Sequence, residues 1–161
     1  EGIMEAGKPF DIAPGAPSTI RRIEAGMLSY GADMTVNNNP FEINLERLID
    51  LDQSADFIGK FALNKISLEG PKKRLVGLKL SGEAMNHPNI GHWPVTYKNT
   101  YIGDVTSAIY SPRLQYNIAL GIILTKYSEL NQELMVKSDG GYFTGTVSAL
   151  PFHKKLQTSP E

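Results

Sequence analysis

The sequence predicts an α+β fold, with short helices in its first 70 residues and a small antiparallel β-barrel or sandwich in the rest. Apolar residues recur at helical spacing only in the first part. The second part alternates short β-compatible runs with turn residues, as small barrels and sandwiches do. Composition agrees, because 15 glycines and 10 prolines among 161 residues favour turns and short strands over long helices.

Two helices are expected in the first part. One opens at Pro17–Thr19, where a hydroxyl side chain can cap the free amide groups, and ends at Gly31. A second follows Gly59. Residues 41–51 fit a strand and a helix equally well, and Pro9–Pro17 is expected to be a loop. The apolar face of the first helix would consist of Ile20, Ile23, Met27 and Tyr30.

The second part contains six runs that read as strands. The polar turns Lys98–Thr100 and Ser138–Gly141 each lie between two such runs, and Asp-Gly and Gly-Gly pairs tolerate the positive φ of tight hairpins. We therefore expect two hairpins. The six runs are 74–80, 94–97, 101–110, 116–124, 134–137 and 142–150.

Charge divides the chain near Gly70–Pro71. Residues 1–70 carry 6 basic and 11 acidic side chains, whereas residues 71–161 carry 10 basic and 6 acidic ones. The Gly-Pro pair breaks regular structure at this point. We therefore predict one domain over 1–70, a barrel domain over 71–153 and a tail over 154–161.

Composition excludes several classes of function. The chain has no cysteine, which removes disulfides, thiolate zinc sites and thiol nucleophiles. A formal charge of −1 argues against nucleic acid and anionic membranes as partners, and the longest apolar run, Ile118–Leu124, is too short to span a bilayer. His87 and His92 flank Pro88 and Gly91, so no helix aligns them and no metal site is expected.

Few side chains suggest chemistry on their own. Glu24 follows two arginines and precedes small residues, so its carboxylate could accept two parallel N–H bonds from an amino-pyrimidine edge. From the residue chemistry alone, an ordinary helix-surface ion pair with an arginine one turn away is the favoured explanation. Arg113 is either a solvated turn residue or a cation that faces an anionic ligand. Asp33 is expected to cap a turn, and Trp93 to lie in the core.

Several short motifs, in order along the chain, resemble the glycine cleavage T-protein (aminomethyltransferase) family. Residues 22–34 resemble its Arg-x-Glu-x-Gly…Tyr-Gly-x-Asp-Met block. Each further match is weak alone, but together they span nearly the whole chain. They lie at Pro40–Glu42, Asp56–Leu63, Arg74–Leu78, Ile102–Ser107, Ser111–Gly121 and Leu150–Phe152.

This resemblance implies the C-terminal part of a folate-binding α+β lobe followed by a small antiparallel β-barrel. It implies tetrahydrofolate as the cofactor, with Glu24 as the carboxylate that holds the pterin ring. The predicted cofactor-binding residues are Glu24, Tyr30 and Arg113. The family's catalytic Asp lies in the N-terminal half, which nothing in this chain resembles, so the catalytic residue is expected outside it and the chain alone is expected to be inactive.

One departure from the family pattern concerns the folate tail. The family carries an arginine shortly after the Pro-x-Glu motif, near the glutamate tail of folate, whereas residues 50–56 contain no cation. Other groups must then bind the tail. This departure, together with Leu68–Lys73, resembles the branch that contains the folate-dependent dimethylsulfoniopropionate demethylase.

The resemblance implies a transferase that moves a methyl or methylene group from an amine or sulfonium donor to tetrahydrofolate. Its expected partners are the N-terminal half of the same protein, folate and a small-molecule methyl donor, in the cytoplasm or, in a eukaryote, the mitochondrial matrix. Two alternatives stay open. One is a non-catalytic folate-binding or docking module of a flavoprotein amine dehydrogenase of the sarcosine or dimethylglycine type. The other is a structural barrel that binds no ligand.

Overall fold

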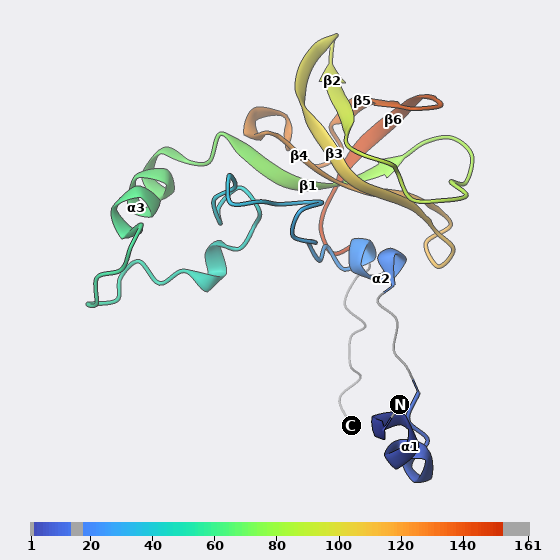
Figure 1. Ribbon diagram of the computed structural model, residues 1–161. Helices are drawn as coiled ribbons and strands as arrows, with labels where there is room; N and C mark the ends of the chain where they lie inside the picture. The colour runs from blue at the N-terminus through green and yellow to red at the C-terminus, as the bar shows by residue number, and fades with distance from the viewer. Residues whose placement is uncertain (1, 14–17, 153–161) are drawn as a thin grey trace, which may run out of the picture.

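Six antiparallel strands form a closed barrel in the computed structural model of the chain, which describes residues 2–13 and 18–152 (Figure 1). The strand order around the barrel is β1-β4-β3-β2-β5-β6, and β6 pairs with β1 to close it. The predicted barrel is thus confirmed over the alternative of a sandwich. The strands are β1 (Lys73–Leu80), β2 (Trp93–Tyr97), β3 (Thr100–Ser111), β4 (Tyr116–Leu124), β5 (Glu133–Ser138) and β6 (Gly141–Ser148).

Both predicted hairpins are present. Lys98 and Asn99 join β2 to β3 with φ values of 48° and 65°, which is the left-handed pair that a two-residue hairpin turn requires. Asp139 and Gly140 join β5 to β6. Local turn chemistry therefore fixes these two connections without help from the rest of the fold.

The helices are short. They are α1 (Gly2–Gly7), α2 (Thr19–Glu24) and α3 (Lys60–Glu69), with 3₁₀ turns η1 (Lys8–Phe10), η2 (Glu46–Leu48) and η3 (Thr125–Tyr127). Helix α3 follows Gly59, as the sequence predicts, and α2 is capped by Ser18, whose hydroxyl accepts the Arg21 amide at 3.3 Å. The loop predicted over Pro9–Pro17 is partly wrong, because η1 includes Pro9 and Phe10.

The prediction that the first helix extends to Gly31 is wrong. Helix α2 ends at Glu24 because Gly26 has a φ of +71°, and the Met27 amide donates back to the Arg22 carbonyl at 2.8 Å. Met27 and Tyr30 are consequently exposed rather than part of an apolar helix face. The ambiguous segment 41–51 is neither strand nor long helix but turns that include η2.

Two apolar clusters explain why the strands are so rich in aliphatic residues. Side chains on one face of each strand fill the barrel, among them Leu78, Val105 and Ala119. The opposite face of β1, β3 and β4 carries a second cluster, which Ile23 of α2 covers from outside. Because β4 is buried on both faces, its sequence reads as a continuous apolar run rather than an alternating one.

Helix α2 is therefore fixed to the outer wall of the barrel (Figure 1). Ile23 is fully buried there, and burying such a side chain contributes about 2 kcal/mol. The segment that follows β6 returns to the same place, since the Phe152 amide donates to the Glu24 carbonyl at 2.9 Å. Helices α1 and α3 lie away from the barrel in Figure 1. The predicted tail, 154–161, lies outside the described residues, and the predicted boundary at 70/71 stays a prediction.

Candidate functional site

Glu24 is a buried carboxylate at the joint between α2 and the barrel. It is the last residue of α2, follows the buried Ile23, and is 5% exposed. The packing of Ile23 against the barrel wall forces the next side chain toward the end of β3. Glu24 is therefore not the surface glutamate of the simpler sequence interpretation.

Both oxygens of Glu24 have donors from the β3–β4 turn. The Ser111 hydroxyl donates to Oε1 at 2.5 Å, and the Arg113 guanidinium lies 2.7 Å from Oε2. The Leu114 amide donates to the Ser111 oxygen at 3.1 Å, so the single Ser111 proton is directed to Glu24. The turn thus supplies one neutral donor and one cation to a single buried acid.

The negative charge of Glu24 acts on a neighbouring tyrosine, Tyr116. The pKa of Tyr116, the first residue of β4, is raised from its ordinary value by burial and, second, by the negative charge of Glu24. An anionic phenolate beside an anionic carboxylate is unfavourable, so Tyr116 stays protonated to higher pH. Tyr116 can therefore serve as a spectroscopic reporter of Glu24.

The Glu24 carboxylate borders a hollow of about 430 Å³, which lies within the usual size range of small-molecule sites. Two cations, Arg21 from α2 and Arg113 from the turn, also line it. The carboxylate and the two guanidinium groups together suit a ligand that has N–H donors at one end and negative charge elsewhere. The lining residues are Ser18, Ile20, Arg21, Glu24, Pro112 and Arg113.

A second buried acid, Asp33, joins the loop after α2 to the barrel. Its side chain is fully buried and accepts four hydrogen bonds, two of them from Arg22 (2.6 Å) and the Ser29 amide (2.8 Å). The other two come from the hydroxyls of Thr106 and Ser107 in β3, both at 2.6 Å. Asp33 thus does more than cap a turn, because it connects helix, loop and strand.

A β-bulge makes this cluster possible. Successive strand residues normally point to opposite faces, so adjacent side chains cannot both reach one partner. In β3 the register slips between Val105 and Ser107, which leaves Thr106 as an extra residue opposite β4. Thr106 and Ser107 therefore both reach Asp33, and Arg22 also donates to Ser107 at 2.8 Å.

The three residues predicted to bind the cofactor do not all gather at one place. Glu24 and Arg113 lie side by side, whereas Tyr30 is 68% exposed and is not among the residues that line their hollow. Trp93 lies in the core, as predicted. His87 and His92 are exposed, and His92 hydrogen-bonds the Ala32 carbonyl at 2.8 Å through Nε2.

Sequence reasoning missed the residues that support Glu24 and Asp33. Ser111 contacts an acid 87 positions earlier in the chain, and Thr106 contacts one 73 positions earlier, so no local pattern could pair them. One signal was available. Thr106, Ser107 and Ser111 are polar residues in a strand that is otherwise largely buried and apolar, which indicates buried hydrogen-bond partners.

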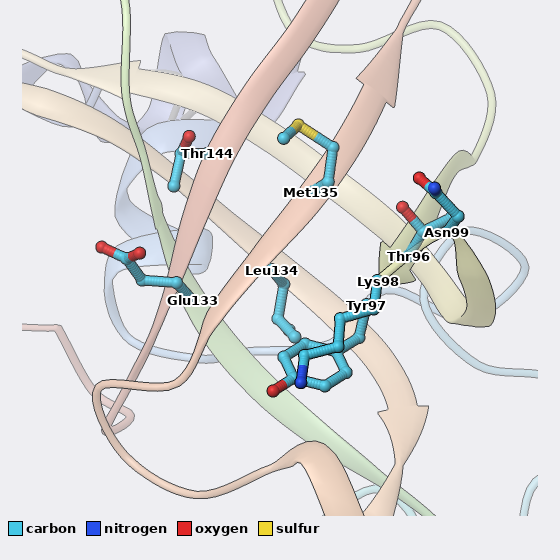
Figure 2. Close-up of a pocket in the computed structure, with 8 residues that line it drawn as sticks. All are labelled: Thr96, Tyr97, Lys98, Asn99, Glu133, Leu134, Met135 and Thr144. Atoms are coloured by element: carbon cyan, nitrogen blue, oxygen red, sulfur yellow. The ribbon is translucent and has the colours of Figure 1, made fainter.

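A separate hollow of about 320 Å³ lies where β2 meets β5 (Figure 2). These strands pair through only two residue pairs, the second being Thr96 with Met135, so they part beyond that point. Figure 2 shows Leu134 and Met135 pointing to opposite sides of β5. The charged residues of this hollow, Lys98 and Glu133, are both exposed, so it offers no desolvated group for catalysis.

Within residues 2–13 and 18–152, no group of three or more His, Asp or Glu side chains is placed to hold a metal ion. No helix in the same ranges is long and apolar enough to cross a membrane.

Comparison with known proteins explains this architecture. Residues 73–154, just over half of the chain, match the family model described as the glycine cleavage T-protein C-terminal barrel domain. The chain belongs to the glycine cleavage T-protein family. The resemblance inferred from the motifs is thereby confirmed, as is the predicted C-terminal barrel of this family.

Curated relatives in this family are named aminomethyltransferase. One from Prochlorococcus marinus (strain MIT 9313) is 37% identical over 159 residues, covering 99% of this chain and 40% of the relative. One from Synechococcus sp. (strain CC9902) is 43% identical over 141 residues, covering 88% and 38%. The chain therefore spans about 40% of the length of the relatives it matches.

A solved structure agrees with the fold. The glycine cleavage system aminomethyltransferase T from Bartonella henselae superposes with a TM-score of 0.74 at 25% identity. The match covers 84% of this chain and 37% of that protein. The two proteins thus share a fold over most of this chain.

Proposed function

We propose that this chain is the C-terminal part of a tetrahydrofolate-dependent one-carbon transferase in which Glu24 holds the pterin ring. The observation that carries the proposal is the buried Glu24 carboxylate beside a hollow of about 430 Å³. The family names of the relatives support it, since all that are cited above are aminomethyltransferases.

The chemistry of Glu24 fits a pterin. The 2-amino group and the adjacent ring N–H of a pterin form two parallel donors, which match the two oxygens of a carboxylate as an arginine fork does. An ionised carboxylate has about four acceptor sites, so the Ser111 hydroxyl can stay on Oε1 while a pterin binds. Burial of Glu24 strengthens these bonds because little water competes for them.

The residues of this chain would act by positioning. Bound tetrahydrofolate would supply the nitrogen that accepts the one-carbon unit. Glu24 would fix the orientation of the ring, and the Asp33 cluster would hold the segment after α2 rigidly on the barrel. The catalytic Asp that the family resemblance implies would come from the part of the protein outside this chain.

Apolar residues around α3 are exposed, which supports the proposal that this chain is part of a larger protein. Ile58, Phe61 and Leu68 are each at least 86% exposed, and no residue of α3 is buried. Such a surface is unfavourable in water and is typical of a contact face. We propose that the N-terminal part of the protein covers it, and that the exposed Tyr30 faces the cofactor only in that assembly.

Calorimetry with tetrahydrofolate tests the proposal. In the full-length protein, Glu24→Gln should weaken binding about 10- to 100-fold, since hydrogen bonds to a charged group contribute roughly 1.5–3 kcal/mol. The exposed Glu129 provides the control, and Glu129→Gln should leave the affinity unchanged. Unchanged affinity in Glu24→Gln would favour a structural barrel. The 161-residue chain alone should bind weakly or not at all, because half of the folate channel is missing.

The reaction type separates two candidates. We favour aminomethyl transfer from an amine donor, because the cited relatives carry that name. Folate-dependent demethylation of a sulfonium compound is the second candidate, which the sequence around Leu68–Lys73 suggests. Parallel assays with an aminomethyl donor and with dimethylsulfoniopropionate distinguish them. A flavin-binding fold upstream of this chain would instead favour the alternative of a module within an amine dehydrogenase.

A further inference from the structure

Arg113 and Ser111 hold Glu24 in different ways. Ser111 is completely buried, and its oxygen also accepts the Leu114 amide, so this hydroxyl cannot leave without breaking the turn. The Arg113 side chain is 53% exposed, whereas that of Glu24 is only 7% exposed. Of the two partners of Glu24, Arg113 is therefore the one whose side chain reaches solvent.

The backbone that carries Arg113 is fixed, but its side chain has room to move. The Gln115 amide donates to the Ser111 carbonyl at 2.8 Å, and Gln115 has a φ of +64°, which defines a tight turn between β3 and β4. A change of side-chain rotamer would carry the guanidinium from Glu24 into the adjoining hollow or solvent. No change in the turn is required.

The guanidinium and a pterin edge compete for the same acceptor. Both present planar N–H donors to a carboxylate, and Arg113 already donates to Oε2. Arg113 is also too close to Glu24 to bind the glutamate tail of the same folate molecule, because the aminobenzoyl spacer separates that tail from the ring. Its position is therefore not that of the missing tail-binding arginine.

We propose that Arg113 occupies the place of the pterin on Glu24 and leaves it when folate binds, while Ser111 stays and keeps the carboxylate oriented. This inference rests on the proposed function, and it changes the role predicted for Arg113 from a ligand contact to a displaceable counter-ion. It makes Arg113 a determinant of affinity, since the Glu24–Arg113 bond must break before a ring can bind.

Two matched variants of the full-length protein test this exchange. Arg113→Gln removes the competing cation, whereas Arg21→Gln removes the same charge from the same hollow but not from Glu24. Tetrahydrofolate binding, measured by calorimetry, should tighten about two- to fivefold in Arg113→Gln, the range that a partly exposed ion pair implies. Arg21→Gln should not tighten the binding, because the Arg21 charge is not the one paired with Glu24.

Weaker or unchanged binding in Arg113→Gln would contradict the exchange of Arg113 for the pterin. Equal tightening in both variants would also contradict it, because that result indicates a general charge effect.

If Arg113→Gln does not fold, NMR of the unmodified protein tests the exchange instead. The Arg113 guanidinium signals should shift toward solvent-exposed values when tetrahydrofolate is added, and signals that do not move would refute the exchange. Failure of the proposed function itself is recognised separately, by Glu24→Gln binding tetrahydrofolate normally.

Discussion

Replacing Asp33 with alanine should destabilise the barrel and its attached helix together. The change leaves four donors without their acceptor, namely Arg22, the Ser29 amide, and the Thr106 and Ser107 hydroxyls. Breaking a buried charged pair by removing one partner costs roughly 3–5 kcal/mol. The Arg22 side chain is 24% exposed, so water recovers part of its solvation, and we expect a loss of about 3 kcal/mol.

Urea denaturation of the 161-residue chain measures this loss. Trp93 is the only tryptophan and is buried in the barrel core, so its fluorescence reports barrel unfolding. With a slope of about 2 kcal/mol/M, the midpoint should fall by about 1.5 M urea. Asp52, which is exposed, provides the control, and Asp52→Ala should shift the midpoint far less. A loss below about 1 kcal/mol in Asp33→Ala would refute the view that Asp33 holds α2 and its loop on β3.

Three further outcomes are expected. Gly103→Ala should cost about 2–4 kcal/mol in the same urea assay, because a Cβ there would lie 2.1 Å from a backbone oxygen of β4 at a φ of +149°; a near-neutral result would contradict this packing. Glu24→Gln should lower the pKa of Tyr116 toward its ordinary value, and an unchanged phenolate absorbance titration would show that the Glu24 charge does not act on it. The pKa of Tyr101 is raised to about 12, first by the hydrogen bond to Asp104, then by burial and then by the negative charge of Asp104. The stability that this contact contributes is therefore complete below about pH 10 and is lost as the pH rises through 12. Asp104→Asn should move that titration to lower pH, and an unshifted titration would rule out the contact.

Local signals in the sequence predicted the hairpins and the strands well. The Lys98-Asn99 and Asp139-Gly140 turns determine their own connections, and the apolar run of β4 is long enough to identify. The closing pairs of the barrel, β1 with β4 and β1 with β6, join segments far apart in the chain. No local pattern specifies them, so the choice between barrel and sandwich needed the structure or the family resemblance.

The end of α2 shows how tertiary contacts override helical spacing. Met27 and Tyr30 have the spacing of a continued helix, but Gly26 adopts a left-handed conformation and the chain turns away. A Cβ at Gly26 would lie 3.2 Å from the side chain of Leu150, so the segment after β6 packs closely over this turn. A prediction based only on residues that are close in the sequence cannot include this contact.

The candidate site was half predictable. Glu24 and Arg113 were identified, one by its motif and one by its turn, but their direct contact depends on the barrel placing residues 89 positions apart beside each other. Ser111 was missed as a partner of Glu24 for the same reason. Polar residues within a buried strand are the signal that would have identified it, because buried hydroxyls require partners.

A crystal structure of the full-length protein with tetrahydrofolate tests the central claim most directly. The account predicts that the 2-amino group and ring N–H of the pterin lie within hydrogen-bond distance of the Glu24 carboxylate. Ser111 should still donate to Oε1, and the Arg113 guanidinium should have left Oε2. A pterin bound elsewhere, with Arg113 still paired to Glu24, would contradict the account.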